Sequence, residues 1–158
     1  MPRSVISALA ATFLLTAPGL AHASSGQFDV ARHADHGLYL VGPNGSPVYT
    51  FISLTGRGTD GLPPLESCNE RCRTDWPVVT VTERPQGSDA LDDTLFATAQ
   101  DGDARVAVYN AWPLFYFAGE DGDATPDGHA IHTYGGWWAL LSPEGEPIRT
   151  GVMPGAGD

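Results

Sequence analysis

The pattern that decides the fold stands at residues 40–48, which read Leu-Val-Gly-Pro-Asn-Gly-Ser-Pro-Val. Apolar residues lead into a Pro-x-Gly turn, and a proline and an aliphatic residue follow it. Because glycine supplies the left-handed backbone conformation that such a turn requires, the pattern predicts a strand, a tight turn and a return strand. Residues 140–148, Leu-Leu-Ser-Pro-Glu-Gly-Glu-Pro-Ile, repeat this pattern 100 positions later.

Two further internal matches indicate that the chain is built from related halves. Residues 44–51 match residues 110–117 at an offset of 66, and residues 75–79 resemble residues 137–141 in placing an aromatic residue before an apolar strand. The matches extend past the turns into the strands, so duplication explains them better than convergent turn chemistry. We therefore expect a mainly β fold, in which two related β-hairpin repeat units pack as one small domain with one or two short helical turns. The expected divisions are a first β repeat unit at 24–81, an acidic connection at 82–103, a second β repeat unit at 104–150 and a flexible tail at 151–158.

Composition agrees with short strands and turns. The 19 Gly and 13 Pro make up about a fifth of the chain, which favours turns over helices. The only candidate helix is 90–100. Aromatic residues gather between positions 109 and 138, and alternation along 112–117 places Trp112, Leu114 and Tyr116 on one face and Phe115 and Phe117 on the other. Trp137 and Trp138 are expected to point in opposite directions for the same reason.

The first 23 residues have the pattern of a secretory signal peptide. Arg3 provides a positive start, an apolar run follows, and Ala21-His22-Ala23 forms an A-x-A cleavage site. We expect cleavage after Ala23 and a periplasmic or secreted location. No cysteine lies near this site, so the sequence offers no lipobox for lipid attachment.

The charge balance limits the partners. Without the first 23 residues the chain keeps 7 Arg against 19 Asp and Glu, and it contains no Lys. Nucleic-acid backbones and anionic membrane surfaces require a basic face, so neither is expected as a partner. No second apolar run approaches the roughly 20 residues of a spanning helix, so we expect no membrane insertion. The partner stays unknown, with an envelope component or a small ligand as the options.

A family resemblance covers positions 28–148. Residues 37–51 carry Gly-x-Tyr-Leu-Val followed by Val-Tyr-x-Phe, then come Cys68-x3-Cys72 and Trp76-Pro77, and a second unit runs from Val108 to Gly145. Together these motifs resemble the secreted tandem-repeat family of unknown function that is known for a Tyr-x4-Asp, or Tyr-x-aromatic-x-x-Asp, motif. Many of its members are predicted bacterial lipoproteins. The resemblance implies a location and an architecture but no chemistry.

The family motif is incomplete in this chain. In the first unit Tyr49 and Phe51 are present, but the motif Asp is absent. In the second unit Tyr116 and Asp121 have the Tyr-x4-Asp spacing, whereas the register aligned with the first unit pairs Phe115 with Glu120.

Cys68 and Cys72 are the only cysteines. On a helical turn their Cα atoms would lie about 6 Å apart, within the range for a disulfide, and the expected compartment is oxidising. The alternative is a redox or metal-binding thiol pair, but redox pairs usually have the spacing C-x-x-C. We favour a disulfide that staples the segment before Trp76.

Four histidines form two H-A-x-H pairs, His33 with His36 and His129 with His132. If the two halves pack symmetrically, the pairs would approach each other, and neutral imidazoles suit copper or zinc. The plainer interpretation is a set of exposed loop histidines that recur because the repeat was duplicated.

The loop after the aromatic strand is acidic. It carries Glu120, Asp121, Asp123 and Asp127, but counting from Asp121 puts Pro126 and His132 where a calcium EF-hand needs Gly and Glu. Weak calcium coordination is one interpretation, and a solvated acidic turn is the favoured one. Together with Trp112 and Tyr116, the residues Glu120, Asp121 and Asp123 form a candidate binding surface.

No sequence signature of an enzyme is present. The chain lacks the G-x-S-x-G and G-x-x-x-x-G-K-[ST] motifs, and without Lys it has no lysine nucleophile. We expect a secreted or periplasmic, non-catalytic repeat protein that acts as a binding or envelope-associated module without a required cofactor. The alternative is a small periplasmic protein that handles copper or zinc through His33, His36, His129 and His132.

Overall fold

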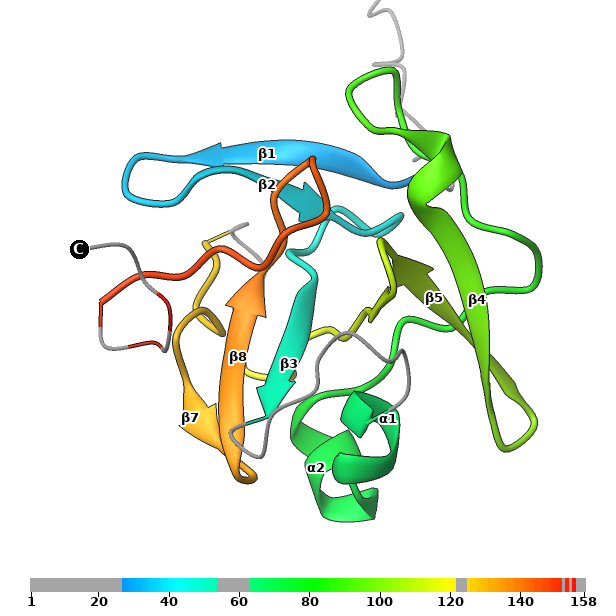
Figure 1. Cartoon of the computed structure of the whole chain (residues 1–158), viewed down its shortest axis with the longest axis vertical. Helices are drawn as coiled ribbons and strands as arrows, with labels where there is room; N and C mark the ends of the chain where they lie inside the picture. Colours follow the sequence, from blue (N-terminus) through cyan, green and yellow to red (C-terminus); the bar gives the residue numbers. More distant parts are fainter. Residues whose placement is uncertain (1–26, 54–62, 122–124, 152, 154, 156–158) are drawn as a thin grey trace, which may run out of the picture.

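The structure, a computed structural model, describes residues 27–53, 63–121, 125–151, 153 and 155 (Figure 1). The expectation of a mainly β fold with short helical turns is confirmed. The strands are β1 (Asp29–His33), β2 (Gly37–Val41), β3 (Tyr49–Ser53), β4 (Phe96–Asp101), β5 (Ala104–Tyr109), β6 (Trp112–Pro113), β7 (His132–Thr133) and β8 (Gly136–Leu140). The helices are α1 (Pro63–Ser67), α2 (Glu70–Asp75) and the 3-10 turn η1 (Asp93–Leu95).

The strands form three small antiparallel sheets. β1 pairs with β2, β8 lies between β3 and β7, and β5 lies between β4 and β6. The pairing of β3 with β8, which places Tyr49 opposite Leu140, joins the first half of the chain to the second. In Figure 1 the β1–β2 ribbon lies across one end of β3 and β8, and α1 contacts β3.

The two Pro-x-Gly turns have the same geometry. Gly45 has φ +81° and donates its amide to the Gly42 carbonyl at 2.8 Å. Gly145 has φ +80° and donates to the Ser142 carbonyl at 2.9 Å. A side chain at either position would be strained, because L-residues rarely adopt this conformation. The predicted turn is therefore present at both places.

Residues at matching positions of the internal repeat contact one another. Tyr49 and Phe115, 66 positions apart, exchange backbone hydrogen bonds of 2.8 and 2.9 Å. Trp76 and Trp138, from the third match, stack with ring centroids 3.9 Å apart and planes 2° apart. Contact between equivalent residues is what a local twofold arrangement produces. The division into units at 24–81, 82–103 and 104–150 itself remains a prediction.

Two aromatic clusters form the core. Phe115 and Phe117 pack into one cluster with Trp76 and Trp138. Trp112, Leu114 and Tyr116 pack into the other, around Phe96 and Tyr109. The predicted alternation along 112–117 is confirmed. Trp138 is fully buried while Trp137 packs with Ile52 and Met153, so these neighbours also point in opposite directions.

The expected helix at 90–100 is wrong. Only the short turn η1 forms there, and the chain then continues as β4, whose six residues all pair with β5. Ala97 and Ala99 favour a helix by local propensity, but Phe96 is only 2% exposed and packs against Phe28 and Tyr109. Burial of this ring and the β5 ladder outweigh the weak helical preference of a short segment.

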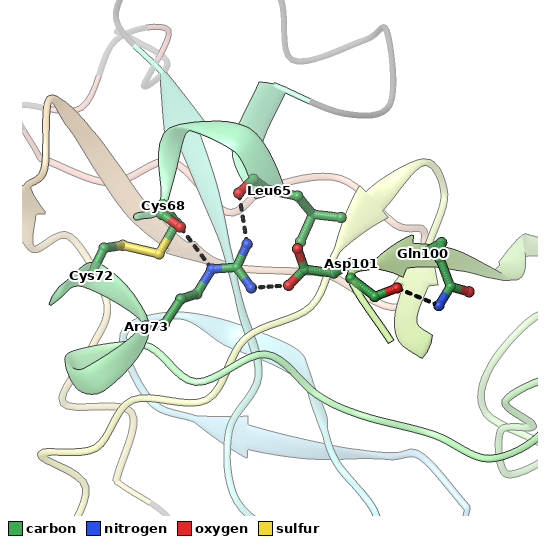
Figure 2. Close-up of polar contacts among 7 residues, drawn as sticks. Leu65, Cys68, Cys72, Arg73, Gln100 and Asp101 are labelled. Atoms are coloured by element: carbon green, nitrogen blue, oxygen red, sulfur yellow. Dashed lines mark hydrogen bonds and ion pairs between the residues drawn. A yellow bond between two sulfur atoms is a disulfide. The ribbon is translucent and has the colours of Figure 1, made fainter. Parts of the chain in front are cut away.

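The Cys68–Cys72 disulfide is present, with Cα atoms 5.1 Å apart across the junction of α1 and α2. The Arg73 side chain lies at the centre of this α1–α2 junction (Figure 2). Its Nε donates to the Cys68 carbonyl at 2.8 Å, one terminal nitrogen donates to the Leu65 carbonyl at 2.6 Å, and the other bonds the Asp101 carboxylate. This arginine therefore joins both helices to β4.

Some predictions fall on parts of the chain that the structure does not describe. They concern the signal segment 1–23, Asp123 and most of the tail 151–158. Within the described ranges, no helix is long and apolar enough to cross a membrane.

Candidate functional site

An open apolar groove of about 480 Å³ lies at the end of α2. Three separate segments line it, namely the end of the helix, the stretch after the aromatic strand and the region of β7. The lining residues are Asp75, Trp76, Phe117, Ala118, Gly119, Ile131 and Thr133. Most of its lining surface is apolar, which suits an uncharged ring or chain of a ligand.

The groove is held in shape by aromatic stacking. Trp76 follows α2 directly and donates its backbone amide to the Cys72 carbonyl at 2.7 Å. Its ring stacks on Trp138 on one side and lies 4.5 Å from the ring of Phe117, with planes 29° apart. Ala118 donates its amide to the Asp75 carbonyl at 2.8 Å, which ties the segment after Phe117 to the end of α2. The walls are therefore fixed by the core itself.

Asp75 places a carboxylate group in the lining of the groove. Tyr134, in the turn between β7 and β8, donates its hydroxyl to one oxygen of the Asp75 carboxylate. That hydrogen bond is the main reason why the pKa of Tyr134 is raised, and Arg71 acts in the opposite direction. Asp75 is exposed, so its carboxylate faces the solvent beside the apolar walls.

One tyrosine of the motif proposed from the sequence contacts an acid from the other half of the chain. The Tyr49 hydroxyl donates to the Glu120 carboxylate, and the Gly128 amide donates to the Tyr49 oxygen at 3.1 Å. Burial raises the pKa of both Tyr49 and Glu120. Tyr49 therefore bonds Glu120 and not Asp121. Glu120 is the acid that the register aligned with the first unit pairs with Phe115. The contact joins one half of the chain to the other.

The remaining motif residues lie elsewhere. Phe51 is a core residue with its ring 4.9 Å from Trp138. The Tyr116 ring covers Gly42, where an added Cβ would come within 2.2 Å of its hydroxyl, and burial raises the pKa of Tyr116 to about 12. Asp121 is exposed. Tyr116 and Asp121 therefore do not form the buried tyrosine–acid contact.

The candidate binding surface of the aromatic strand is mostly inside the protein. Trp112 is 8% exposed and packs in the core. Its burial leaves almost no ring surface for a ligand, whereas Phe117, on the opposite face of the same segment, is half-buried and lines the groove. Binding roles for Glu120 and Asp121 remain predictions.

Three of the four histidines meet. The ring of His33, at the end of β1, stacks on that of His36, in the β1–β2 turn, with centroids 4.7 Å apart, and the ring of His36 lies 4.4 Å from that of His129. The two H-A-x-H pairs thus approach each other, as the symmetric arrangement predicts. His132 is apart from this cluster, with its ring 4.8 Å from Trp137.

The cluster is packed rather than arranged around an ion. His129 Nδ1 accepts from the Leu140 amide at 3.3 Å, so its Nε2 carries the hydrogen and donates to Thr150 Oγ1 at 2.7 Å. His36 Nδ1 is buried without a hydrogen-bond partner. Within the ranges that the structure covers, no group of three or more His, Cys, Asp or Glu side chains is placed to hold a metal ion. A copper or zinc site at these residues stays a prediction.

The histidine cluster predicts an acid-sensitive stability. Burial lowers the pKa of His129 to about 4, with the neighbouring imidazoles of His36 and His33 adding to the effect. An unfolded histidine has a pKa near 6.5. The unfolded chain therefore binds the proton first, and the contribution of His129 is complete above about pH 6.5 and is lost as the pH falls towards 4. Because the ring is partly solvated, we expect a loss of about 1–2 kcal/mol, well below the full conversion of the shift.

Urea unfolding at several pH values between about 7.5 and 4.5 measures this loss. Other acids also titrate in that range, so the readout is the difference between the native chain and His129→Gln, whose amide can keep one of the two hydrogen bonds. The variant should show a shallower decline of the unfolding free energy with falling pH. If the unfolding free energy of both proteins declines identically with falling pH, His129 is not the cause of the acid sensitivity.

Comparison with known proteins gives no match: no family model, no curated protein and no solved structure is similar to this chain.

Proposed function

We propose that this chain is a secreted, non-catalytic module that binds a small ligand with an apolar ring in the groove beside Phe117 and Ile131, with the buried Trp76 ring behind Phe117. The single observation that carries the proposal is the groove itself. Its volume of about 480 Å³ lies within the range of small-molecule sites, roughly 300–1,000 Å³. Its walls are positioned by buried aromatic stacking, so the site exists before a ligand arrives.

The non-catalytic part of the proposal rests on the composition of the groove. Of the described residues that line it, Asp75 is the only titratable one. General acid–base and nucleophilic catalysis use groups that act on one another, such as a nucleophile and a base within hydrogen-bond reach. An apolar cleft with a single exposed carboxylate suits binding better than bond cleavage.

The secreted part rests on the pattern of residues 1–23 and on a disulfide that an oxidising compartment would maintain. Membership of the tandem-repeat family of unknown function belongs to the same proposal. It is supported by the contacts between matching residues, above all the pairing of Tyr49 with Phe115 and the stacking of Trp76 on Trp138.

A neutral aromatic probe, naphthylethanol, tests the proposal by calorimetric titration. Ala118 is exposed at the rim of the groove, so Ala118→Trp should fill the opening without disturbing the core. We expect the variant to bind the probe at least about tenfold more weakly than the native chain, equivalent to ~1.4 kcal/mol. Ala97→Trp is the matched control, because Ala97 is exposed on β4 and lies outside the groove lining.

Equal melting temperatures of the three proteins would show that the variants fold alike. A native chain that binds no probe contradicts the proposal. So does binding that is unaffected by Ala118→Trp or equally weakened by Ala97→Trp, because the probe would then bind elsewhere.

A further inference from the structure

We propose that the ligand of this groove is an organic cation, a small amine whose apolar body lies against Phe117 and Ile131 and whose ammonium group meets Asp75. The inference rests on the proposed function and adds the chemical class of the ligand. Two features of the groove carry it, namely one oriented carboxylate and the aromatic wall formed by Phe117.

The carboxylate is placed for a ligand to reach it. Among the lining residues that the structure describes, Asp75 is the only charged one, and it is exposed. The Tyr134 hydroxyl donates to one of its two oxygens, which orients the carboxylate and leaves the second oxygen with acceptor capacity. An ammonium group is a compact donor that fits such an acceptor.

The aromatic wall favours the same class. The faces of aromatic rings carry a negative quadrupole, so an ammonium group is attracted to them, and aromatic cages recognise quaternary ammonium ligands by this attraction. Phe117 is half-buried in the wall, stacked on Trp76 behind it. A cation in the groove therefore meets both a carboxylate and a ring.

The surrounding charge works in the same direction, with one exception. The chain has a net charge of −11, and Gly119 at the edge of the groove is followed by Glu120 and Asp121. Arg71, one turn before Asp75 in α2, interacts with the Tyr134 hydroxyl and offsets part of this field. The preference for a cation should therefore be modest, and an anion should be disfavoured.

Three probes that share one ring and differ in charge provide the test: naphthylethylamine as the cation, naphthylethanol as the neutral form and naphthylacetate as the anion. We expect the native chain at neutral pH to bind the amine about three- to fivefold more tightly than the alcohol, and the carboxylate most weakly. Raising the salt from about 50 to 500 mM should reduce the preference for the amine, since screening weakens exposed charge pairs.

Substitutions test whether the preference for the amine over the alcohol depends on the Asp75 carboxylate. Asp75→Asn should remove most of the preference for the amine over the alcohol, leaving only the part that the Phe117 ring and the net negative charge of the chain supply. Glu70→Gln, at an exposed position of the same helix outside the groove lining, is the matched control and should keep the preference. Tyr134→Phe should keep it as well, because the carboxylate retains its charge, and this variant separates loss of the charge from loss of the hydrogen bond.

The outcomes distinguish the two proposals. If the native chain binds the amine and the alcohol equally, or if Asp75→Asn keeps the preference, the inference of a cationic ligand is wrong while the groove remains a binding site. If none of the three probes binds, the proposed function fails with it.

Discussion

Replacing Trp138 with alanine should lower the free energy of unfolding by about 3–5 kcal/mol, the largest effect that we expect from a single substitution. Trp138 is completely buried, with its ring stacked on Trp76 and 4.9 and 5.1 Å from those of Phe51 and Phe115. The change removes the ring that backs Trp76 and leaves a cavity that the strand β8 cannot easily close. The Trp138 Nε1 hydrogen bond to Thr133 at 3.1 Å is lost as well.

The neighbouring Trp137 provides the matched control. It lies on the opposite face of β8, is only half-buried, and packs with Ile52 and Met153 outside the stacked cluster. Trp137→Ala should cost less than half as much as Trp138→Ala in urea unfolding monitored by circular dichroism. Similar losses for both variants would contradict the placement of the core at the Trp76–Trp138 stack.

Arg73→Met should lower the free energy of unfolding by about 3 kcal/mol, because it removes one ion pair and two hydrogen bonds to carbonyls at once. The Leu65 and Cys68 carbonyls lie at the ends of the helical segments and would lose their donor (Figure 2). The guanidinium also lies 5.7 Å from the centroid of the Phe115 ring, so packing against the core is weakened too. Methionine preserves most of the aliphatic length, which limits the effect to the lost contacts of the guanidinium group.

Asp101→Asn isolates the ion pair from the helix carbonyls. Arg73 keeps both carbonyl contacts in this variant, so we expect a loss of about 1 kcal/mol, typical of a partly exposed pair. Denaturant unfolding with the disulfide intact compares the two variants. If Asp101→Asn costs as much as Arg73→Met, the arginine acts through β4 rather than by holding the α1–α2 junction.

Local patterns predicted the parts of the fold whose causes are local. The turns at Gly45 and Gly145 follow from the demand for a positive φ, and the alternation from Trp112 to Phe117 follows from the geometry of an extended chain. The segment 96–101 could not be predicted in this way. Its strand conformation depends on pairing with β5 and on a core pocket for Phe96, neither of which is visible in the segment itself.

The candidate site likewise combines features that the sequence predicts with features that depend on tertiary packing. Symmetric packing of the two halves is one interpretation of the histidine pairs, and under it the pairs approach each other. His132, however, is the first residue of β7 and lies against Trp137, so only three of the four rings meet. The groove is built from residues 75–76, 117–119, 131 and 133, which come together only through the tertiary fold. Trp76 and Phe117 belong to patterns that the sequence shows, whereas nothing in the sequence marks Ile131 or Thr133.

The most direct test of the binding groove is a ¹H–¹⁵N chemical-shift map of the chain during titration with naphthylethylamine. The proposed function predicts that the perturbed amides cluster at Phe117, Ala118, Gly119, Ile131 and Thr133, and that Ala118→Trp abolishes the changes. A second cavity, lined by Phe28, Pro43 and Thr82, provides an internal comparison and should stay unperturbed. Perturbations that gather at that second cavity, or that are absent from the groove at saturating probe, would contradict the account.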